Sequence, residues 1–133
     1  MELMTRLYTF SYYWMPVVIY CVLIFILSSH PMPETIPSWP LKDKLLHFAV
    51  YSVLGALSLR GFRHLLWRHH GTLVMAASIL FTGLYGVSDE WHQYYVPSRT
   101  AELGDLLADF SGGVCGVWFY DWLTGKYPAL GRF

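Results

Sequence analysis

The chain has 133 residues, of which 55% are hydrophobic and 18% aromatic, while only 14% carry a charged side chain. An ordinary soluble domain has about 25% charged residues, so a soluble fold of this length could not bury so much apolar surface. The formal net charge is zero and the basic residues form no run, which excludes an electrostatic argument for nucleic-acid binding. We therefore predict an all-α integral membrane protein with a single domain, residues 1–133.

The first apolar segment covers about residues 12–29 and follows a short polar N-terminus. Its length, and the lack of a clear small-x-small cleavage site, favour an uncleaved transmembrane helix over a secretory signal peptide. The stretch 30–40 that follows contains four prolines, which exclude a continuous helix there. They are Pro31, Pro33, Pro37 and Pro40.

Three further apolar segments follow at about residues 45–62, 72–94 and 106–123. Each of the four segments is close to the roughly 20 residues that a helix needs to cross a hydrocarbon core of roughly 30 Å. Short polar stretches at 63–71 and 97–104 separate them. The pattern predicts a bundle of four transmembrane helices.

Basic residues indicate how this bundle is oriented. With four spans, both termini and the middle loop share one side of the membrane. That side holds Arg6, Arg60, Arg63, Arg68, Lys126 and Arg132, and the other side holds Lys42, Lys44 and Arg99. The positive-inside rule then predicts a multi-pass protein of the cytoplasmic (inner) membrane with both termini cytoplasmic.

Polar side chains gather at the predicted outer ends of the second, third and fourth helices. They are Asp43, Lys44 and His47, then Asp89, Glu90 and Gln93, then Arg99 and Glu102 in the loop, then Asp105 and Asp109. Because they come from separate stretches of sequence, we expect folding to bring them into one site.

The spacing of the acidic residues and glycines supports this expectation. Asp109 lies one helical turn, roughly 6 Å, deeper than Asp105. A carboxylate at that depth is costly unless it is paired, protonated or facing a wet cavity. The step from Gly112 to Gly116 predicts a close approach of two helix backbones that would hold the polar end rigid.

Three patterns in these segments resemble the motifs of the VanZ-like family. They are Asp43-Lys44-x-x-His47-Phe48 with Tyr51, Tyr85-Gly86-x-x-Asp89-Glu90-x-x-Gln93, and Pro97-x-Arg99 with Asp105, Asp109 and Gly112. They fall within residues 43–116. The resemblance implies a small multi-pass bacterial membrane protein of the cell envelope, from a family linked to glycopeptide (teicoplanin) resistance. Many relatives carry Asn at the position of Asp109, so the acid here adds a charge to the family pattern.

As an enzyme, the predicted site would use His47 as a general base, because an unperturbed histidine titrates near neutral pH. Asp43 or Asp89 would orient the imidazole, and Glu90 would be a further acid–base group. The cluster has no obvious serine or cysteine nucleophile, so this reading predicts a hydrolase or transferase that activates a water molecule.

Five residues are assigned to binding in this reading: Lys44, Gln93, Arg99, Asp105 and Asp109. The two cations suit a phosphate or carboxylate group, and the outer location favours a lipid-linked or cell-wall precursor as partner. No residue is assigned as a metal ligand, because no strict motif such as His-Glu-x-x-His is present. A divalent cation as cofactor is left open.

The alternative is a non-catalytic membrane assembly or binding protein. In that case the polar cluster, including Asp43, His47, Arg99 and Asp105, would be an interhelical salt-bridge network that fixes the bundle. Transport is less favoured, because four spans are few and no pair of broken helices is evident. Association with further copies of the chain is left open.

Overall fold

The computed structural model describes residues 2–31, 41–66, 70–97 and 99–131. Within these residues the chain forms four α-helices and a short 3₁₀ helix, with no strand, which confirms the all-α prediction. The elements are α1 (Glu2–Ser28), α2 (Lys42–Leu65), α3 (Gly71–Tyr94), α4 (Leu103–Lys126) and η1 (Pro128–Gly131). Pro33, Pro37, Pro40, Arg68, Arg132 and the side chain of Arg6, all used above, lie outside the described residues.

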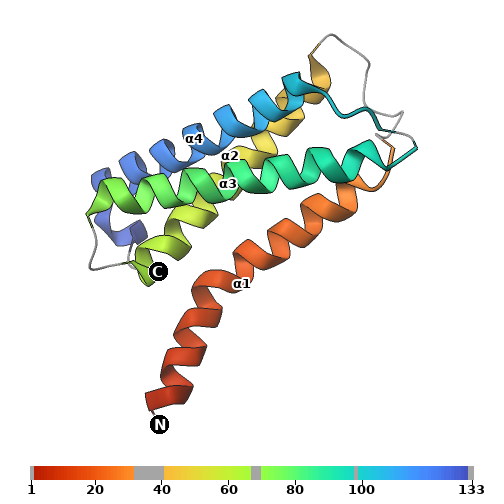
Figure 1. The fold of residues 1–133 in the computed structure, drawn as a ribbon. Coiled ribbons are helices and arrows are strands. Elements are labelled where there is room, and N and C mark those ends of the chain that lie inside the picture. The colour runs from red at the N-terminus through yellow and green to blue at the C-terminus, as the bar shows by residue number, and fades with distance from the viewer. Residues whose placement is uncertain (1, 32–40, 67–69, 98, 132–133) are drawn as a thin grey trace.

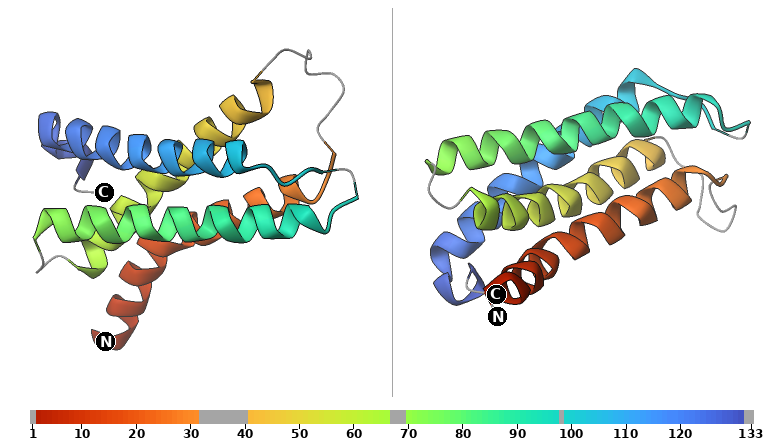
Figure 2. Two further views of the ribbon diagram at one scale, coloured as in Figure 1. Left: turned by 45° about the horizontal axis from the view of Figure 1, so that its top comes forward. Right: turned by 60° about the horizontal axis from the view of Figure 1, so that its bottom comes forward.

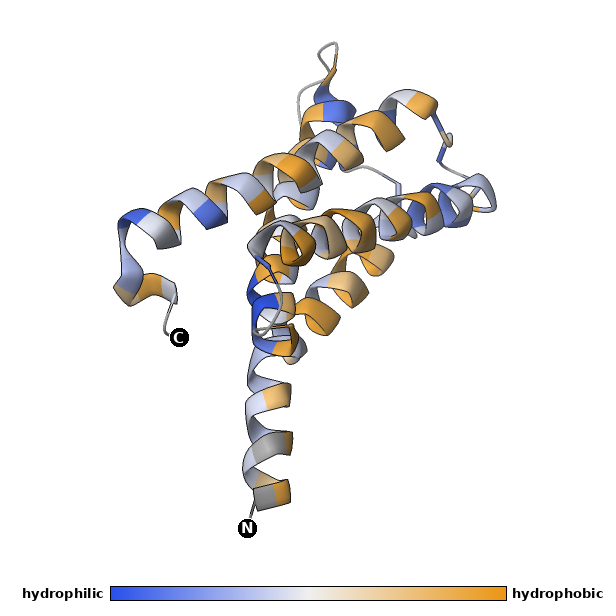
Figure 3. Cartoon of the chain, turned by 60° about the vertical axis from the view of Figure 1, so that its left-hand side comes forward, coloured by the Kyte–Doolittle hydropathy of each residue, from blue (hydrophilic) through white to orange (hydrophobic). Residues whose placement is uncertain are grey.

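Three helices within the described residues are long and apolar enough to cross a membrane, namely α1, α2 and α3. Helix α4 has the same 24-residue length as α2 and α3 but contains Asp105, Asp109 and Asp121, and it does not meet the same measure. Figure 3 shows hydrophilic residues near the helix ends and hydrophobic ones along the middle of the helices. A crossing by α4 therefore stays a prediction.

Helix α1 begins at Glu2, about ten residues before the predicted apolar segment, because a helix can continue beyond the part that is apolar enough for lipid. Pro16 lies inside α1, and the helix changes direction along its length (Figure 1). Proline has no N–H to donate to the carbonyl four residues earlier, which is that of Tyr12. Arg60 of α2 donates to this carbonyl at 3.5 Å and lies over the Tyr12 ring, so α2 partly replaces the missing partner.

Helices α2 and α4 run in the same direction and form the most extensive helix pair, while α3 packs against both. Helix α1 lies mainly against α2, and its N-terminal part diverges from the other three helices (Figures 1 and 2). A Cβ atom at Gly116 would overlap the Ser52 carbonyl, and one at Gly112 would overlap the Phe48 carbonyl. The close backbone approach predicted from these two glycines is confirmed.

Two apolar clusters hold the rest of the bundle together. One joins α1 to α2 through Val17, Ile24, Tyr51 and Leu54, and the other joins α2, α3 and α4 through Leu59, Val74 and Val117. At the end of the bundle away from the predicted site, Arg63 of α2 pairs with Asp121 and donates to Thr124 of α4 at 2.7 Å. These contacts hold the C-terminal ends of α2 and α4 together.

Candidate functional site

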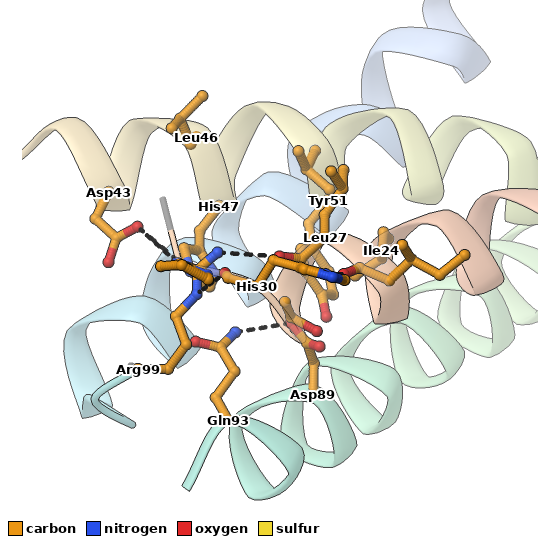
Figure 4. A pocket seen from close by; sticks show the side chains of 14 residues that line it. Ile24, Leu27, His30, Asp43, Leu46, His47, Tyr51, Asp89, Gln93 and Arg99 are labelled. Carbon is orange, nitrogen blue, oxygen red and sulfur yellow. Dashed lines mark hydrogen bonds and ion pairs between the residues drawn. The ribbon is translucent and has the colours of Figure 1, made fainter. Parts of the chain in front are cut away.

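Polar residues predicted from the sequence lie together at the end of the bundle where α2 and α4 begin and α3 ends. They border a cavity of about 400 Å³ between α1, α2 and α3. Five of the predicted residues line it: Asp43, His47, Asp89, Gln93 and Arg99. Figure 4 shows them converging from α2, α3 and the loop that precedes α4, with Ile24 and Leu27 of α1 beside them.

His47 and Asp109 form the most buried pair of this site. His47 Nδ1 lies 2.8 Å from Asp109 Oδ1, and the side chains are 10% and 0% exposed. The other ring nitrogen of His47 lies 3.9 Å from Asp43 Oδ1, four residues earlier on the same helix face. The acid on α4 therefore fixes the orientation of the imidazole, and the second nitrogen faces the Asp43 side of the site.

Asp89 and Tyr51 bring further polar atoms to this point. Gln93 donates to Asp89 Oδ2 at 3.1 Å, one turn along α3. Asp89 Oδ1, Asp109 Oδ2 and the Tyr51 hydroxyl are buried and have no hydrogen-bond partner among the described residues. Buried polar atoms of native proteins normally have a partner, so these three mark the place where a ligand, ion or water would bind.

Arg99 connects the site to α1. Its Nε donates to the His30 carbonyl at 2.9 Å and its Nη2 to the Leu27 carbonyl at 3.1 Å, while Nη1 lies 3.9 Å from Asp43 Oδ1. A cation at the end of a helix is favourable because the last carbonyls of the helix have no partner within it. Arg99 thereby fastens the C-terminal end of α1 over the cavity.

A second group of predicted residues fastens the start of α4 and does not line the cavity. Lys44 Nζ lies 2.9 Å from Glu102 Oε2 and 3.1 Å from Asp105 Oδ1. The backbone N–H of Glu102 donates to Glu90 Oε2 at 3.0 Å, which places the Glu90 carboxylate beside the α4 N-terminus. The hydrogen bond from Lys44 lowers the pKa of the Glu102 carboxyl below its usual range.

Three contributors were not assigned to the site from the sequence. Tyr51 lies four residues after His47, so helical spacing could have placed it on the same face of α2. The Leu27 and His30 positions contribute backbone carbonyls, for which the residue types give no signal.

The comparisons with known proteins give one result. A sequence model of the VanZ/LLP1 family matches residues 6–124. The chain belongs to the VanZ/LLP1 family. Neither the comparison with curated proteins nor that with solved structures gives a match. The family match extends over all four helices, whereas the motifs used in the sequence analysis cover only residues 43–116.

In this VanZ/LLP1 chain the site can serve acid–base chemistry or hold a cation. A histidine oriented by a carboxylate is the arrangement of a general base and its positioning partner. Among the described residues, two groups offer ligand atoms that lie within 4.8 Å of one another: Asp43, His47 and Asp105, and His47, Asp89 and Asp109. Carboxylates outnumber cations here, so the site favours ligands that donate hydrogen bonds or carry positive charge.

Proposed function

We propose that this member of the VanZ/LLP1 family binds an amphiphilic, lipid-linked molecule of the cell envelope. The supporting observation is the two-sided lining of the cavity. Ile24, Leu27 and Val50 give it an apolar wall from α1 and α2, and Asp43, His47, Asp89, Gln93 and Arg99 give it a polar one. Such a lining suits a ligand with a hydrocarbon chain and a polar head group.

The size of the cavity agrees with this class of ligand. Its volume of about 400 Å³ lies near the lower end of the roughly 300–1,000 Å³ typical of small-molecule sites. That volume suits a polar head group and the first part of a chain, and the rest of the chain would lie in lipid. Helix α1, whose surface is largely apolar and exposed, is the side from which lipid reaches the cavity.

The orientation inferred from the positive-inside rule puts the cavity at the outer face of the cytoplasmic membrane. A lipid-linked cell-wall precursor has its head group at that level after translocation, and the hydroxyl, amide and amine groups of its sugar and peptide parts can donate hydrogen bonds to the carboxylates of the site. The link of VanZ-like proteins to teicoplanin resistance favours such a precursor over ordinary phospholipids, and we propose it as the ligand class.

A photoreactive lipid-linked cell-wall precursor tests the proposal with protein in lipid nanodiscs. Leu46 lines the cavity, and Leu46→Trp would fill part of it. The matched control is Leu84→Trp, at an exposed position of α3 outside the lining. We expect Leu46→Trp to weaken labelling about tenfold, equivalent to about 1.4 kcal/mol, and Leu84→Trp to leave it unchanged. Labelling that is equal for both variants, or equal for a phospholipid of the same chain length, would contradict the proposal.

A second candidate function is hydrolysis or group transfer on the bound precursor, favoured by the 2.8 Å contact between His47 and Asp109. If the protein is an enzyme, the unaltered chain should convert the precursor to a product. His47→Gln should form no product but should still be photolabelled by the precursor. Loss of labelling together with the product would mean that His47 serves binding.

The salt-bridge alternative from the sequence fits one part of the cluster. Lys44, Glu102 and Asp105 form interhelical ion pairs outside the cavity lining, and Glu90 accepts a backbone hydrogen bond there. We propose that this part holds the loop and the start of α4, while the cavity-lining part binds the ligand.

A further inference from the structure

We propose that His47, Asp89 and Asp109 form a binding site for one divalent transition-metal cation. The three residues come from α2, α3 and α4, and each offers a ligand atom within 4.8 Å of the others. All three side chains are largely buried, with Asp109 at 0% and Asp89 at 5% exposure. The inference does not depend on the proposed function, because a cation can bind here without any lipid-linked ligand.

Unsatisfied polar atoms are the observation that separates this site from an ordinary acidic cluster. The Tyr51 side chain is 1% exposed, and its hydroxyl has no hydrogen-bond partner among the described residues. It belongs to the same polar group as Asp89 and Asp109 (Figure 4 shows Tyr51, His47 and Asp89 around one space). A water molecule bound to the cation would give this hydroxyl a partner.

The two acids each present a free oxygen as well. Asp89 Oδ1 and Asp109 Oδ2 are buried without a partner in the described part of the chain, while the other oxygen of each acid is held by Gln93 or His47. Asp89, which Gln93 holds through one oxygen, therefore has the form of a metal ligand with an orienting partner, whereas His47 would coordinate the cation itself and give up its hydrogen bond to Asp109. Gly86 keeps this space open, because a Cβ there would lie 3.2 Å from Asp109 Oδ2.

Charge favours a dication at this position. Two carboxylates with one neutral imidazole carry two negative charges, which a divalent cation balances. The alternative group of Asp43, His47 and Asp105 is a weaker candidate. Lys44 already lies 3.1 Å from Asp105, and Asp43 is 41% exposed and faces Arg99.

The ligand set and the distances point to Zn²⁺ or Mn²⁺. An imidazole with two carboxylates suits these ions better than Mg²⁺ or Ca²⁺, which prefer oxygen ligands alone. His47 Nδ1 and Asp109 Oδ1 lie 2.8 Å apart as a hydrogen-bonded pair, and a cation bound by both atoms would replace that hydrogen bond at a separation of roughly 3 Å, as expected for bonds of about 2.1 Å at right angles. Asp89 completes the set by moving about 1 Å or more toward the other two residues, and water fills the remaining positions.

The test measures metal binding by the full chain in detergent or nanodiscs after treatment with a chelator, without added lipid-linked ligand. Calorimetric titration with ZnCl₂ and with MnCl₂ should show one site per chain for at least one of the two ions. We expect Asp89→Asn and Asp109→Asn each to weaken metal binding by more than the 10–100-fold that is typical of losing an orienting partner. Asp105→Asn should keep the site, since Asp105 belongs only to the competing group and does not line the cavity.

Binding at the middle-loop histidines must be separated from binding at this site. The double variant His64→Gln and His70→Gln should keep the stoichiometric site, and bound metal should raise the melting temperature of the unaltered chain but not that of Asp89→Asn. If Asp109→Asn does not fold, the metal affinity of Asp89→Asn alone tests the site. The proposal is overturned if the unaltered chain binds neither ion stoichiometrically, if the two Asn variants bind normally, or if the loop variant alone abolishes binding.

Discussion

His47 and Asp109 show how much a single buried contact can determine at this end of the bundle. Asp109 is fully buried on α4, and within the described residues its only hydrogen-bond partner is the imidazole of His47 on α2. Burying a carboxylate requires a partner for its charge, because the interior cannot replace the water that the charge loses. The stability of the pair and the orientation of the candidate base therefore depend on each other.

Replacing His47 by Ala in the presence of a chelator should destabilise the chain by about 3 kcal/mol or more, since it leaves the Asp109 charge buried without a partner. Adding Asp109→Asn to this variant should restore at least half of the loss, because the amide carries no charge. The free energy of unfolding measured by titration with a denaturing detergent provides the check. A double variant no more stable than His47→Ala would show that the pair is not what holds Asp109.

Lys44 and Glu102 predict a pH dependence. The pKa of Glu102 is lowered in the folded chain, mainly by the hydrogen bond from Lys44. The ionised pair therefore contributes stability fully above the ordinary pKa of a glutamate, and this contribution is lost as the pH falls through the lowered pKa. Acidification from pH 6 to pH 3 should lower the melting temperature more in the unaltered chain than in Glu102→Gln. Both partners are solvent-exposed, so a small difference that decreases with salt is expected.

Residue types and spacing predicted which polar side chains meet but not all of their roles. Asp89 and Glu90 are adjacent in the sequence, so their side chains point about 100° apart around α3. Asp89 faces the cavity, whereas Glu90 accepts the Glu102 N–H. Which of the two acids faces the cavity depends on the rotation of α3 in the bundle and on the path of the loop before α4. Neither is specified by motif spacing.

At the scale of elements, the pairing of α2 with α4 rests on positions where no side chain fits. Ser52 and Phe48 present their backbone carbonyls to Gly116 and Gly112, and a Cβ at Gly55 would overlap the Gly113 carbonyl. Helices in lipid gain little from apolar contact alone, so a close backbone approach is a main source of their association. The step between Gly112 and Gly116 was readable in the sequence. That its partner is α2 follows only from the three-dimensional arrangement.

Substituting Gly116 by Ala should destabilise the bundle by about 1–3 kcal/mol, because the added methyl group forces α2 and α4 apart. Gly125→Ala is the matched control on the same helix, since a Cβ there meets nothing within 4 Å. The control should be neutral or stabilising by about 0.5–1 kcal/mol, as expected for Ala in place of Gly in a helix. Thermal unfolding in micelles distinguishes the two, and equal effects would rule out close packing at Gly116.

For the whole molecule, hydropathy predicted the number and order of the helices, because lipid selects apolar segments of a fixed length. It did not predict that α1 extends to Glu2 or that it diverges from the other helices. Those features depend on Pro16 and on contacts with α2, which leave little trace in average hydropathy. The role of α4 is likewise open to a direct test, since only α1, α2 and α3 meet the measure for a span in the described residues.

Reporters fused to the two ends of the chain test the topology. If all four helices cross the bilayer, as we expect, N-terminal and C-terminal fusions both report a cytoplasmic location. A reporter after residue 66 should agree with them, and one after residue 97 should report the outer side. Termini on opposite sides, with the two internal reporters unchanged, would show that α4 does not cross. Termini that are both external would reverse the inferred orientation and place the cavity toward the cytoplasm.

The parallel contact between α2 and α4 also determines when the site comes into existence during synthesis. His47 and Asp109 are 62 residues apart in the chain. At roughly 5–20 residues per second, a ribosome needs roughly 3–12 s to extend the chain from one to the other. During that interval the groove of Phe48, Ser52 and Gly55 has no α4 to fill it. A chain that ends before residue 103 therefore leaves this face of α2 without the helix that covers it in the complete bundle.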